Sequence, residues 1–492
     1  MIEKPTTVSE NQPQEFKRSL TWIDGTFIVM GSMIGSGIFL VSAEMARYVG
    51  GAGWLMLLWL ISGLITVMGA LTYGELGGML PLAGGQFIYI KRAYNSFFAF
   101  LWGWGFFMVE QTGTIAAVAV AFARYVGFFI PGISTLNYIF DGFIKVSTVQ
   151  ILAILMIITQ TFINTRGIES GKWIQSVFTS AKTVALFLLI ALGLIVANPS
   201  HLAENFKDAW HFESQAGMIT WHDAASGVGL VLVLGTAIIG ALFSSTTWSN
   251  VTFIAGELKN PKRDIPLSLA VGTLTVTILY FLANLAYLNL LPLHGNLNGG
   301  TDVARGIMFA KNDLVGTAAA SQIFEGAAPA IMAILVIVST FGCNSGMILS
   351  GARVTYAMAK EGLFFKRTST LNKAQVPAFA LWIQCAWASL LCLSGTYSAL
   401  LDYVIFVSLL FWAITAIGIF ILRVKEPNLP RPYKVLGYPV LPALFIFLCL
   451  SICTILLITK TENSGRGLLI LLIGIPFYFL LKKRSVTAKT VV

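Results

Sequence analysis

Hydrophobic residues in this chain form long runs separated by short polar segments. A helix needs about 20 mostly apolar residues to cross a bilayer, and lipid offers the backbone no hydrogen-bonding partner outside a helix or a closed barrel. Twelve runs approach or exceed that length: 25–43, 54–74, 93–123, 146–165, 173–197, 224–256, 265–290, 326–352, 377–395, 403–422, 435–459 and 467–481. The pattern predicts an all-α membrane protein with twelve transmembrane helices.

The basic residues between the runs predict how the chain is oriented. Cytoplasmic loops of membrane proteins are enriched in Lys and Arg. If the N-terminus and every second loop are cytoplasmic, that side holds 23 of the 32 Lys and Arg residues, the other side holds 8, and Lys182 alone lies inside a run. We therefore expect a multi-pass protein of the cell membrane with both termini in the cytoplasm. The net charge of +10 is then an orientation signal and does not indicate nucleic-acid binding.

Composition excludes an ordinary soluble protein. The chain is 56% hydrophobic and 11% charged, whereas soluble domains carry about 25% charged residues. No P-loop or metal-ligand spacing is present, so we expect neither an enzyme nor a cofactor or metal. The cysteines all lie in apolar runs, where packing explains them; they are Cys343, Cys385, Cys392, Cys449 and Cys453.

The first run, GTFIVMGSMIGSGIFLVSA, does not resemble a plain helix. Gly31, Gly35 and Gly37 fall within seven residues, and each Gly costs about 1 kcal/mol relative to Ala in a helix interior. Small residues can also serve close helix packing, so both interpretations stay open. A break here would present the N–H groups of the following half-helix, and that end of a helix attracts carboxylates.

The sixth run, 224–256, is also unusual, because it contains 33 uncharged residues where about 20 suffice. Its middle, from Phe243 to Asn250, is rich in Ser and Thr, whose side chains can satisfy backbone groups where a helix opens. A polar stripe between packed helices is the alternative. Because inverted-repeat transporters place discontinuous helices at corresponding positions of their halves, we expect the two breaks to meet near the membrane midplane.

Three ionisable residues in or near the apolar runs are candidates for a functional role. Lys182 lies about 14 Å into the fifth run, where a charged residue is a functional candidate by default, although it could also snorkel to the interface. Glu110, midway through the third run, is a candidate proton carrier, a partner for Lys182, or a structural acid bonded to a neighbouring helix. Glu75 lies close to the cytoplasmic face and is expected to shape an inner gate or a loop contact.

Three segments carry a family resemblance: GSMIGSGIF, YGELGGMLPLAGGQFIYI and GELKNPKRDIP. They resemble the amino acid–polyamine–organocation (APC) superfamily over residues 17–440, and FTSAK and LRVKEPNLPRPYKV are similar to its L-type amino-acid transporter branch. The resemblance implies a five-plus-five inverted repeat (LeuT-type fold) with helices 1 and 6 discontinuous. Its implied parts are a cytoplasmic tail, a first repeat, a second repeat, and helices 11 and 12 with the C-terminal tail, at residues 1–21, 22–197, 198–423 and 424–492.

The resemblance also implies a substrate site. The substrate carboxylate would meet the first-helix backbone, its amino group would meet carbonyls of both breaks, Phe243 would close over it, and Trp248 would line the pocket. Lys182, with Cys343 beside it, would stand in place of a sodium ion. The implied substrate-binding residues are Ile34, Gly35, Ser36, Gly37, Phe243, Ser244, Ser245, Thr246 and Trp248.

The chain departs from the L-type pattern in three places. Thr246 and Thr247 stand where that branch often has two glycines, which narrows the pocket or adds hydroxyl groups to it. Cys343 stands where Ser is expected. The outer loop 130–147 has no Cys, the residue through which animal members attach a heavy chain, so no such partner is expected.

These features lead to a main hypothesis and two rivals. The main one is a sodium-independent secondary transporter, an exchanger of small to medium neutral L-amino acids that works by alternating access in the lipid bilayer. The first rival is proton-coupled uptake of cationic amino acids or polyamines, with Glu110 as the acid. The second is a nutrient-sensing receptor or a channel, although a channel would require a continuous polar path. Saturable countertransport would distinguish a carrier from this second rival.

Overall fold

The computed structural model describes residues 18–489, apart from 142–144, 197–198, 215–226, 325, 327 and 395–396. This part of the chain is helical, with one short antiparallel hairpin. The N-terminal elements are α1 (Trp22–Met33), α2 (Gly37–Val49), α3 (Ala52–Met79), α4 (Gln86–Ala93), α5 (Ser96–Gly105), the π-helical η1 (Phe106–Glu110), α6 (Gln111–Val126), β1 (Tyr138–Asp141), β2 (Lys145–Ser147), α7 (Thr148–Asn164), α8 (Ile168–Ile195) and α9 (Pro199–Lys207).

The later elements begin after residue 226. They are α10 (Gly227–Ala237), α11 (Ile239–Ser245), the 3₁₀ turn η2 (Thr246–Ser249), α12 (Asn250–Phe253), η3 (Ala255–Glu257), α13 (Pro261–Leu290), α14 (Asp302–Arg305), η4 (Lys311–Asp313), α15 (Val315–Ala320), α16 (Ala328–Lys360), η5 (Lys366–Ser369), α17 (Ala378–Ser394), α18 (Tyr397–Lys425), α19 (Val440–Thr459) and α20 (Thr461–Lys489).

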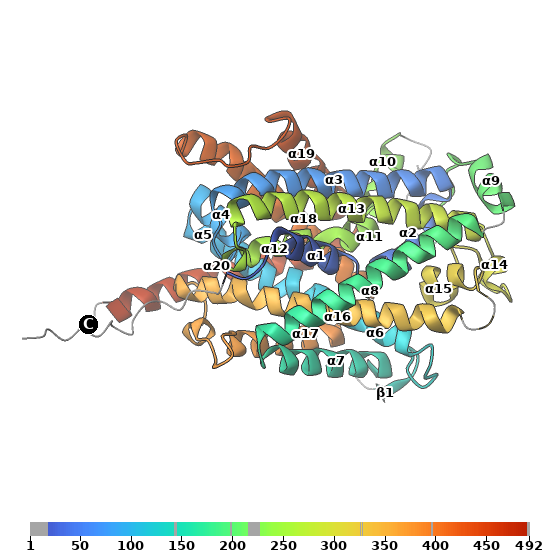
Figure 1. Ribbon diagram of the computed structural model, residues 1–492, viewed down its shortest axis with the longest axis horizontal. Helices are drawn as coiled ribbons and strands as arrows, with labels where there is room; N and C mark the ends of the chain where they lie inside the picture. The colour runs from blue at the N-terminus through green and yellow to red at the C-terminus, as the bar shows by residue number, and fades with distance from the viewer. Residues whose placement is uncertain are drawn as a thin grey trace, which may run out of the picture.

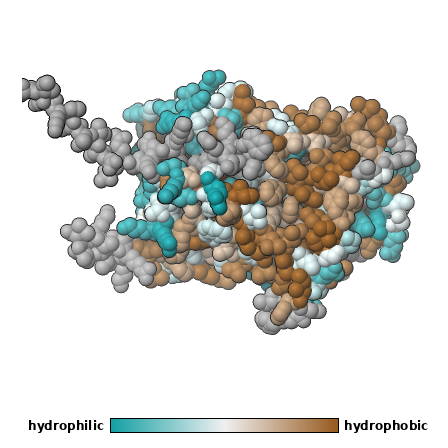
Figure 2. All heavy atoms as spheres, turned by 60° about the horizontal axis from the view of Figure 1, so that its bottom comes forward, coloured by the Kyte–Doolittle hydropathy of each residue, from teal (hydrophilic) through white to brown (hydrophobic). Residues whose placement is uncertain are grey.

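The long helices run lengthwise through an elongated bundle. Helices α3, α13 and α16 follow the long axis, and α8 crosses them obliquely (Figure 1). Helix α4 and the C-terminal part of α20 lie at one end, while α9 and α14 lie at the other. Figure 2 shows a broad hydrophobic band on one face, with hydrophilic residues gathered toward the ends. This distribution matches a protein whose sides contact lipid and whose ends contact water.

Most of the predicted runs correspond to helices of membrane-spanning length. Within the described residues nine helices are long and apolar enough to cross a membrane, or ten if the bent pair α1 and α2 is counted as one span. The fourth and ninth runs correspond to shorter apolar helices, α7 and the segment Ala378–Leu393 of α17.

The first run is bent at its glycine-rich centre. Helix α1 begins at a capping box, in which Thr21 and Asp24 satisfy each other's backbone N–H groups. It ends at Met33, and α2 begins at Gly37 with its axis turned by 43°. Three residues, Ile34 to Ser36, therefore lie between two helices of the same run.

The sixth run changes its helical type rather than opening a gap. Helix α11 ends at Ser245, the next four residues form the 3₁₀ turn η2, and α12 resumes at Asn250. The Thr246 hydroxyl donates to the carbonyl of Phe243 at 3.0 Å. The backbone N–H of Thr246 donates to the same carbonyl, so a hydroxyl side chain adds to the backbone bonding where the helix changes type.

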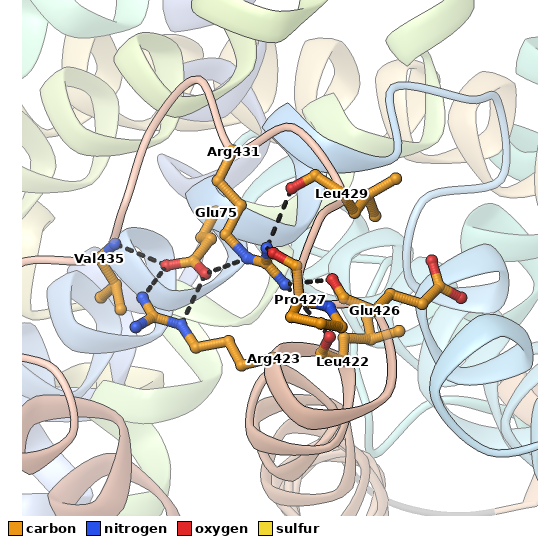
Figure 3. A network of polar contacts seen from close by, with 8 residues as sticks. All are labelled: Glu75, Leu422, Arg423, Glu426, Pro427, Leu429, Arg431 and Val435. Atoms are coloured by element: carbon orange, nitrogen blue, oxygen red, sulfur yellow. Dashed lines mark hydrogen bonds and ion pairs between the residues drawn. The ribbon is translucent and has the colours of Figure 1, made fainter.

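One end of the bundle is held by a buried carboxylate. Glu75 of α3 is fully buried and accepts two hydrogen bonds from Arg423, at 2.7 and 3.0 Å, and one from the backbone N–H of Val435 at 2.8 Å (Figure 3). The guanidinium of Arg431 lies 3.5 Å away and also donates to four carbonyls at the end of α18 and in the loop after it. Glu75 therefore holds a loop contact, one of its two predicted roles.

Replacing Glu75 with Gln should destabilise the protein strongly. The change leaves two arginines facing a neutral amide, and breaking a buried ion pair costs about 3–5 kcal/mol. The thermal midpoint of the purified protein in detergent measures this. Glu426→Gln is the matched control, because its partner Arg92 is 57% exposed and exposed pairs contribute about 1 kcal/mol or less. Equal shifts for the two variants would contradict the assignment.

Candidate functional site

The carbonyl groups at the end of α1 are satisfied by side chains from three other helices. A helix end leaves its last four carbonyls without intrahelical donors. Here the donors are the Nζ of Lys182 to Gly31, the Sγ of Cys343 to Ser32 at 3.0 Å, the hydroxyl of Tyr280 to Met33 at 2.7 Å, and the hydroxyl of Ser339 to Ile34 at 3.1 Å. Helices α8, α13 and α16 therefore converge on the bend between α1 and α2.

Lys182 is the cation of this cluster. It is buried on α8, donates to Gly31, and lies close to the thiol of Cys343. The C-terminal end of a helix carries partial negative charge, so α1 offers this ammonium group a favourable position. Lys182 does not snorkel to a membrane surface, and its recorded partner is a backbone carbonyl rather than Glu110.

The start of α2 presents N–H groups on the other side of the bend. Ser36 is its N-cap residue and makes no side-chain capping bond. The N–H groups of the first turn have no carbonyl four residues earlier in the helix, and of these the N–H of Phe39 donates to the carbonyl of Ser36 at 3.1 Å. Together with the positive end of the helix dipole they form an anion-binding arrangement. The bend thus separates the C-terminal end of α1, whose carbonyl groups face Lys182, from the N-terminal end of α2, which presents N–H groups.

The sixth run contacts this start of α2 directly. A Cβ atom on Gly37 would lie 2.1 Å from Oγ of Ser244 and 3.0 Å from its Cα, so only Gly allows this approach. The hydroxyl of Tyr280 also lies 3.1 Å from the carbonyl oxygen of Ser244 while it donates to Met33. Tyr280 thus bridges the two irregular segments. The sequence analysis predicted that these segments meet.

The other predicted residues of the sixth run are buried beside this contact. Phe243, Ser245 and Thr246 are each exposed by 5% or less. Trp248 is fully buried in η2, with its ring edge-on to Tyr73 at 4.7 Å and to Trp412 at 5.5 Å between centroids. Trp248 therefore faces α3 and α18.

Glu110 lies apart from the bend. It ends the π-helical segment η1, is buried, and faces Ser408 of α18. No ion pair of Glu110 occurs within the described part of the chain. The predicted pairing of Glu110 with Lys182 is therefore not found, and its two other predicted roles remain to be weighed.

A second polar pocket lies where α2, α10 and α18 approach the joint between α19 and α20. It is lined by Glu44, Tyr48, Asp402 and Lys460, with the Lys460 Nζ 3.8 Å from Asp402. Burial lowers the pKa of Lys460, but the carboxylate of Asp402 and its neighbours Tyr48 and Glu44 raise it, and the net effect is upward. This pocket holds the Lys460–Asp402 ion pair and shares no lining residue with the α1 bend.

Tyr280 and Ser339 were not predicted from the sequence. Ser339 could have been suggested by its spacing, because it precedes Cys343 by four residues and so shares its helix face. The sequence around Tyr280 gives no such signal, because a single tyrosine in an apolar run can face any of the neighbouring helices. Its role depends on how α13 packs against α1 and α11.

Comparison with known proteins adds an independent line of evidence. The model of the amino acid permease family matches residues 20–478. The chain is 28% identical to the human "Large neutral amino acids transporter small subunit 2" over 94% of this chain and 80% of the relative. It is 27% identical to the "Serine/threonine exchanger SteT" of Bacillus subtilis over 95% and 98%, and 28% identical to the human "Cystine/glutamate transporter" over 95% and 85%.

The chain belongs to the amino acid permease family, because the family model covers most of its length. The resemblance to the L-type branch of the APC superfamily is confirmed by these relatives. The prediction that the chain is a transporter rather than an enzyme is confirmed with it.

Gly37→Ala should impair transport, because the new methyl group overlaps Ser244. Overpacking costs about 1–3 kcal/mol, so we expect a lower thermal midpoint and roughly tenfold slower exchange of labelled serine in proteoliposomes. Gly465→Ala is the control, since nothing lies within 4 Å of the added atom. Adding Ser244→Gly should restore part of the loss, and no restoration would rule out this contact as the cause.

Tyr280→Phe should slow transport without unfolding the protein. The change removes the hydroxyl that donates to Met33 and lies 3.1 Å from the carbonyl oxygen of Ser244. A lost buried hydrogen bond costs about 1 kcal/mol, or roughly fivefold in rate. Tyr287→Phe is a control on the same helix, because the Tyr287 hydroxyl is buried and has no partner among the described residues. Similar exchange rates for the two variants would remove Tyr280 from the site.

Proposed function

We propose that this protein is a sodium-independent exchanger of small to medium neutral L-amino acids that works by alternating access. The observation that carries the proposal is the bend between α1 and α2, with Lys182 at its carbonyl side and N–H groups at its other side. The substrate carboxylate binds the backbone at Gly35, Ser36 and Gly37. Its amino group binds carbonyls from Ile34 and from the α11 end at Phe243, Ser244 and Ser245.

The remaining parts of the site follow from this placement. Phe243 closes over the substrate, and Trp248 lines its side-chain pocket with Thr246. Lys182 of α8 and Cys343 of α16 both contact the carbonyl end of α1. They supply the contacts that a sodium ion would otherwise make there. The bonds from Lys182 to Gly31 and from Cys343 to Ser32 support this role, because a fixed ammonium group already neutralises those carbonyls.

Substrate size is the least constrained part of the proposal. Thr246 and Thr247 occupy the start of η2, and both are nearly buried. Two threonine side chains leave less space than two glycines, which favours small and medium substrates. The relatives, which include a transporter of large neutral amino acids and a serine/threonine exchanger by name, support neutral amino acids as the substrate class.

The architecture proposed with this function is a five-plus-five inverted repeat with helices 1 and 6 discontinuous. Within the described residues the nine long apolar helices, the bent pair α1 and α2 taken as a tenth span, and the two shorter apolar helices α7 and α17 support a count of twelve. The divisions fall at residues 1–21, 22–197, 198–423 and 424–492. Both termini are assigned to the cytoplasm of a cell-membrane protein, supported by the Lys and Arg distribution. The cysteine-free loop 130–147 supports function without a heavy chain.

Purified protein is placed in liposomes preloaded with unlabelled serine. It should exchange this serine rapidly for labelled alanine, serine and leucine, and only slowly for labelled tryptophan or lysine. Replacing sodium with choline should leave the rate unchanged. Lys182→Ala should lower exchange sharply, because it leaves Gly31 without its donor and removes the buried charge. Failure to exchange any member of a complete amino-acid panel would overturn the proposal. Uptake that requires sodium would overturn the role of Lys182.

A further inference from the structure

The connection between α6 and α7 exposes many large hydrophobic side chains for a loop. Among its described residues the exposed ones are Phe128, Phe129, Ile130, Leu136, Tyr138, Ile139 and Phe140. A longer loop at the same end of the bundle, from Leu291 to Leu314, exposes only Leu297. Contiguous exposed apolar surface marks contact with a partner or a membrane, so the α6–α7 connection is not an ordinary water-exposed loop.

Hydrogen bonds hold this connection in one shape. The Thr148 hydroxyl, at the start of α7, lies 3.0 Å from the carbonyl oxygen of Gly132 and 3.1 Å from that of Ser134. It also accepts a bond from the N–H of Ser134 at 2.9 Å. The backbone N–H of Thr148 donates to Asn137, and the Asn137 side chain donates to Gly132. Strands β1 and β2 pair with each other. The connection thus satisfies much of its own backbone, as a segment next to lipid must.

The connection has a polar side and an apolar side. The polar side lines a cavity of about 290 Å³, together with residues of α6 and η4; the lining includes Arg124, Ser134, Thr135, Asn312 and Asp313. On β1, three successive side chains, Tyr138, Ile139 and Phe140, are 44%, 63% and 66% exposed. The rest of the described protein therefore leaves this strand uncovered.

Helix α7 is short for a membrane span, and this shortness explains where the apolar strand lies. Its 17 residues extend about 25 Å, whereas the hydrocarbon layer is about 30 Å thick. Arg166, just beyond its C-terminal end, marks one boundary of that layer. The layer is then incomplete by about 5 Å at the other end of α7, where β2 joins it directly, since β2 ends at Ser147 and α7 begins at Thr148.

The lipid-facing side of α7 continues into the strand. Leu155, Ile158 and Phe162 are exposed and recur at helical spacing, which defines one apolar side of the helix. Helix α7 lies at the edge of the bundle, and β1 lies beyond it toward the end that carries α9 and α14 (Figure 1). Lys145 of β2 lies 5.3 Å from the centre of the Tyr138 ring. Tyr and Lys are typical of the boundary between acyl chains and headgroups.

We propose that the α6–α7 connection inserts into the outer leaflet of the bilayer, with β1 at the boundary between phospholipid headgroups and acyl chains. Its apolar side then forms one surface with the lipid-facing side of α7, and its polar side keeps the cavity in contact with water. The assignment to the outer leaflet rests on the orientation proposed above.

This insertion fixes one wall of the cavity relative to η4. On that opposite wall Asp313 pairs with Arg47, near the end of α2, at 2.8 Å. The membrane contact therefore lies next to an element that is tied to the second half of the bent first span.

Spin labels in liposomes of phosphatidylcholine and phosphatidylglycerol test the proposal. Ile139→Cys is labelled, and its collisions with oxygen, which enters lipid, are compared with those of a water-soluble nickel chelate. Leu155→Cys is the lipid-facing control, and Asn298→Cys, in the exposed loop at the same end, is the water-facing control. Unsubstituted protein gives the background, because its five cysteines are buried. We expect the label at 139 to favour oxygen and to lie about 5–10 Å into the boundary region.

Two outcomes would overturn the insertion. Nickel access at 139 equal to that at 298 would place the strand in water, and protection from both reagents would show that protein, such as a second copy of the chain, covers it. Phe140→Cys repeats the measurement if Ile139→Cys does not fold.

A charged strand provides a further test. Replacing Ile139 and Phe140 with Asp should raise nickel access of a label at Leu136→Cys to the level at 298, because carboxylates oppose insertion. Unchanged protection at 136 would contradict anchoring by β1. Serine exchange is measured on the same liposomes, and its absence with the labels inserted would overturn only the transport proposal.

Discussion

The structure depends on how the carbonyl groups at the bend of the first span are satisfied. An unpaired backbone carbonyl inside a membrane protein costs several kcal/mol. The glycine-rich sequence weakens the helix and provides one local donor, the N–H of Gly35 to the carbonyl of Met33 at 2.8 Å. The other donors come from α8, α13 and α16, through Lys182, Tyr280, Cys343 and Ser339. The bend is therefore a property of the assembled bundle, although the glycines that permit it belong to one segment.

This arrangement has a direct consequence for movement. The side chains that satisfy the carbonyls also fix α1 to three other helices, so α1 can tilt only if some of these bonds break or are replaced. Tyr280 is the most constrained, because one hydroxyl lies within hydrogen-bond distance of carbonyls on two segments, Met33 and Ser244. A substrate that binds at this position can replace some of the bonds, which gives it differential affinity for two states.

The sequence predicted the helical runs and the position of the first bend for clear physical reasons. Run length and lipid exposure determine the spans, and Gly35 and Gly37 weaken the helix where α1 ends and α2 begins. The partners of the bend were harder to predict, because Tyr280 acts through tertiary packing between distant segments. The sixth run was expected to break, yet it tightens into a 3₁₀ turn at Thr246, since hydroxyl side chains can bond locally to preceding carbonyls.

The buried ionisable groups differ in how completely they are satisfied, and that difference separates their roles. Glu75 has two arginines and a backbone donor, and Glu257 has Arg353 at 2.6 Å, so each has a specific charged partner. Lys182 has a carbonyl at the negative end of α1. Glu110 has no comparable partner in the described chain. A group that is fully paired in one state resists any change of charge, because the change would leave its partners unpaired. Glu110 has no charged partner of this kind among the described residues, so its position in the bundle is set by packing and by its polar neighbours rather than by an ion pair.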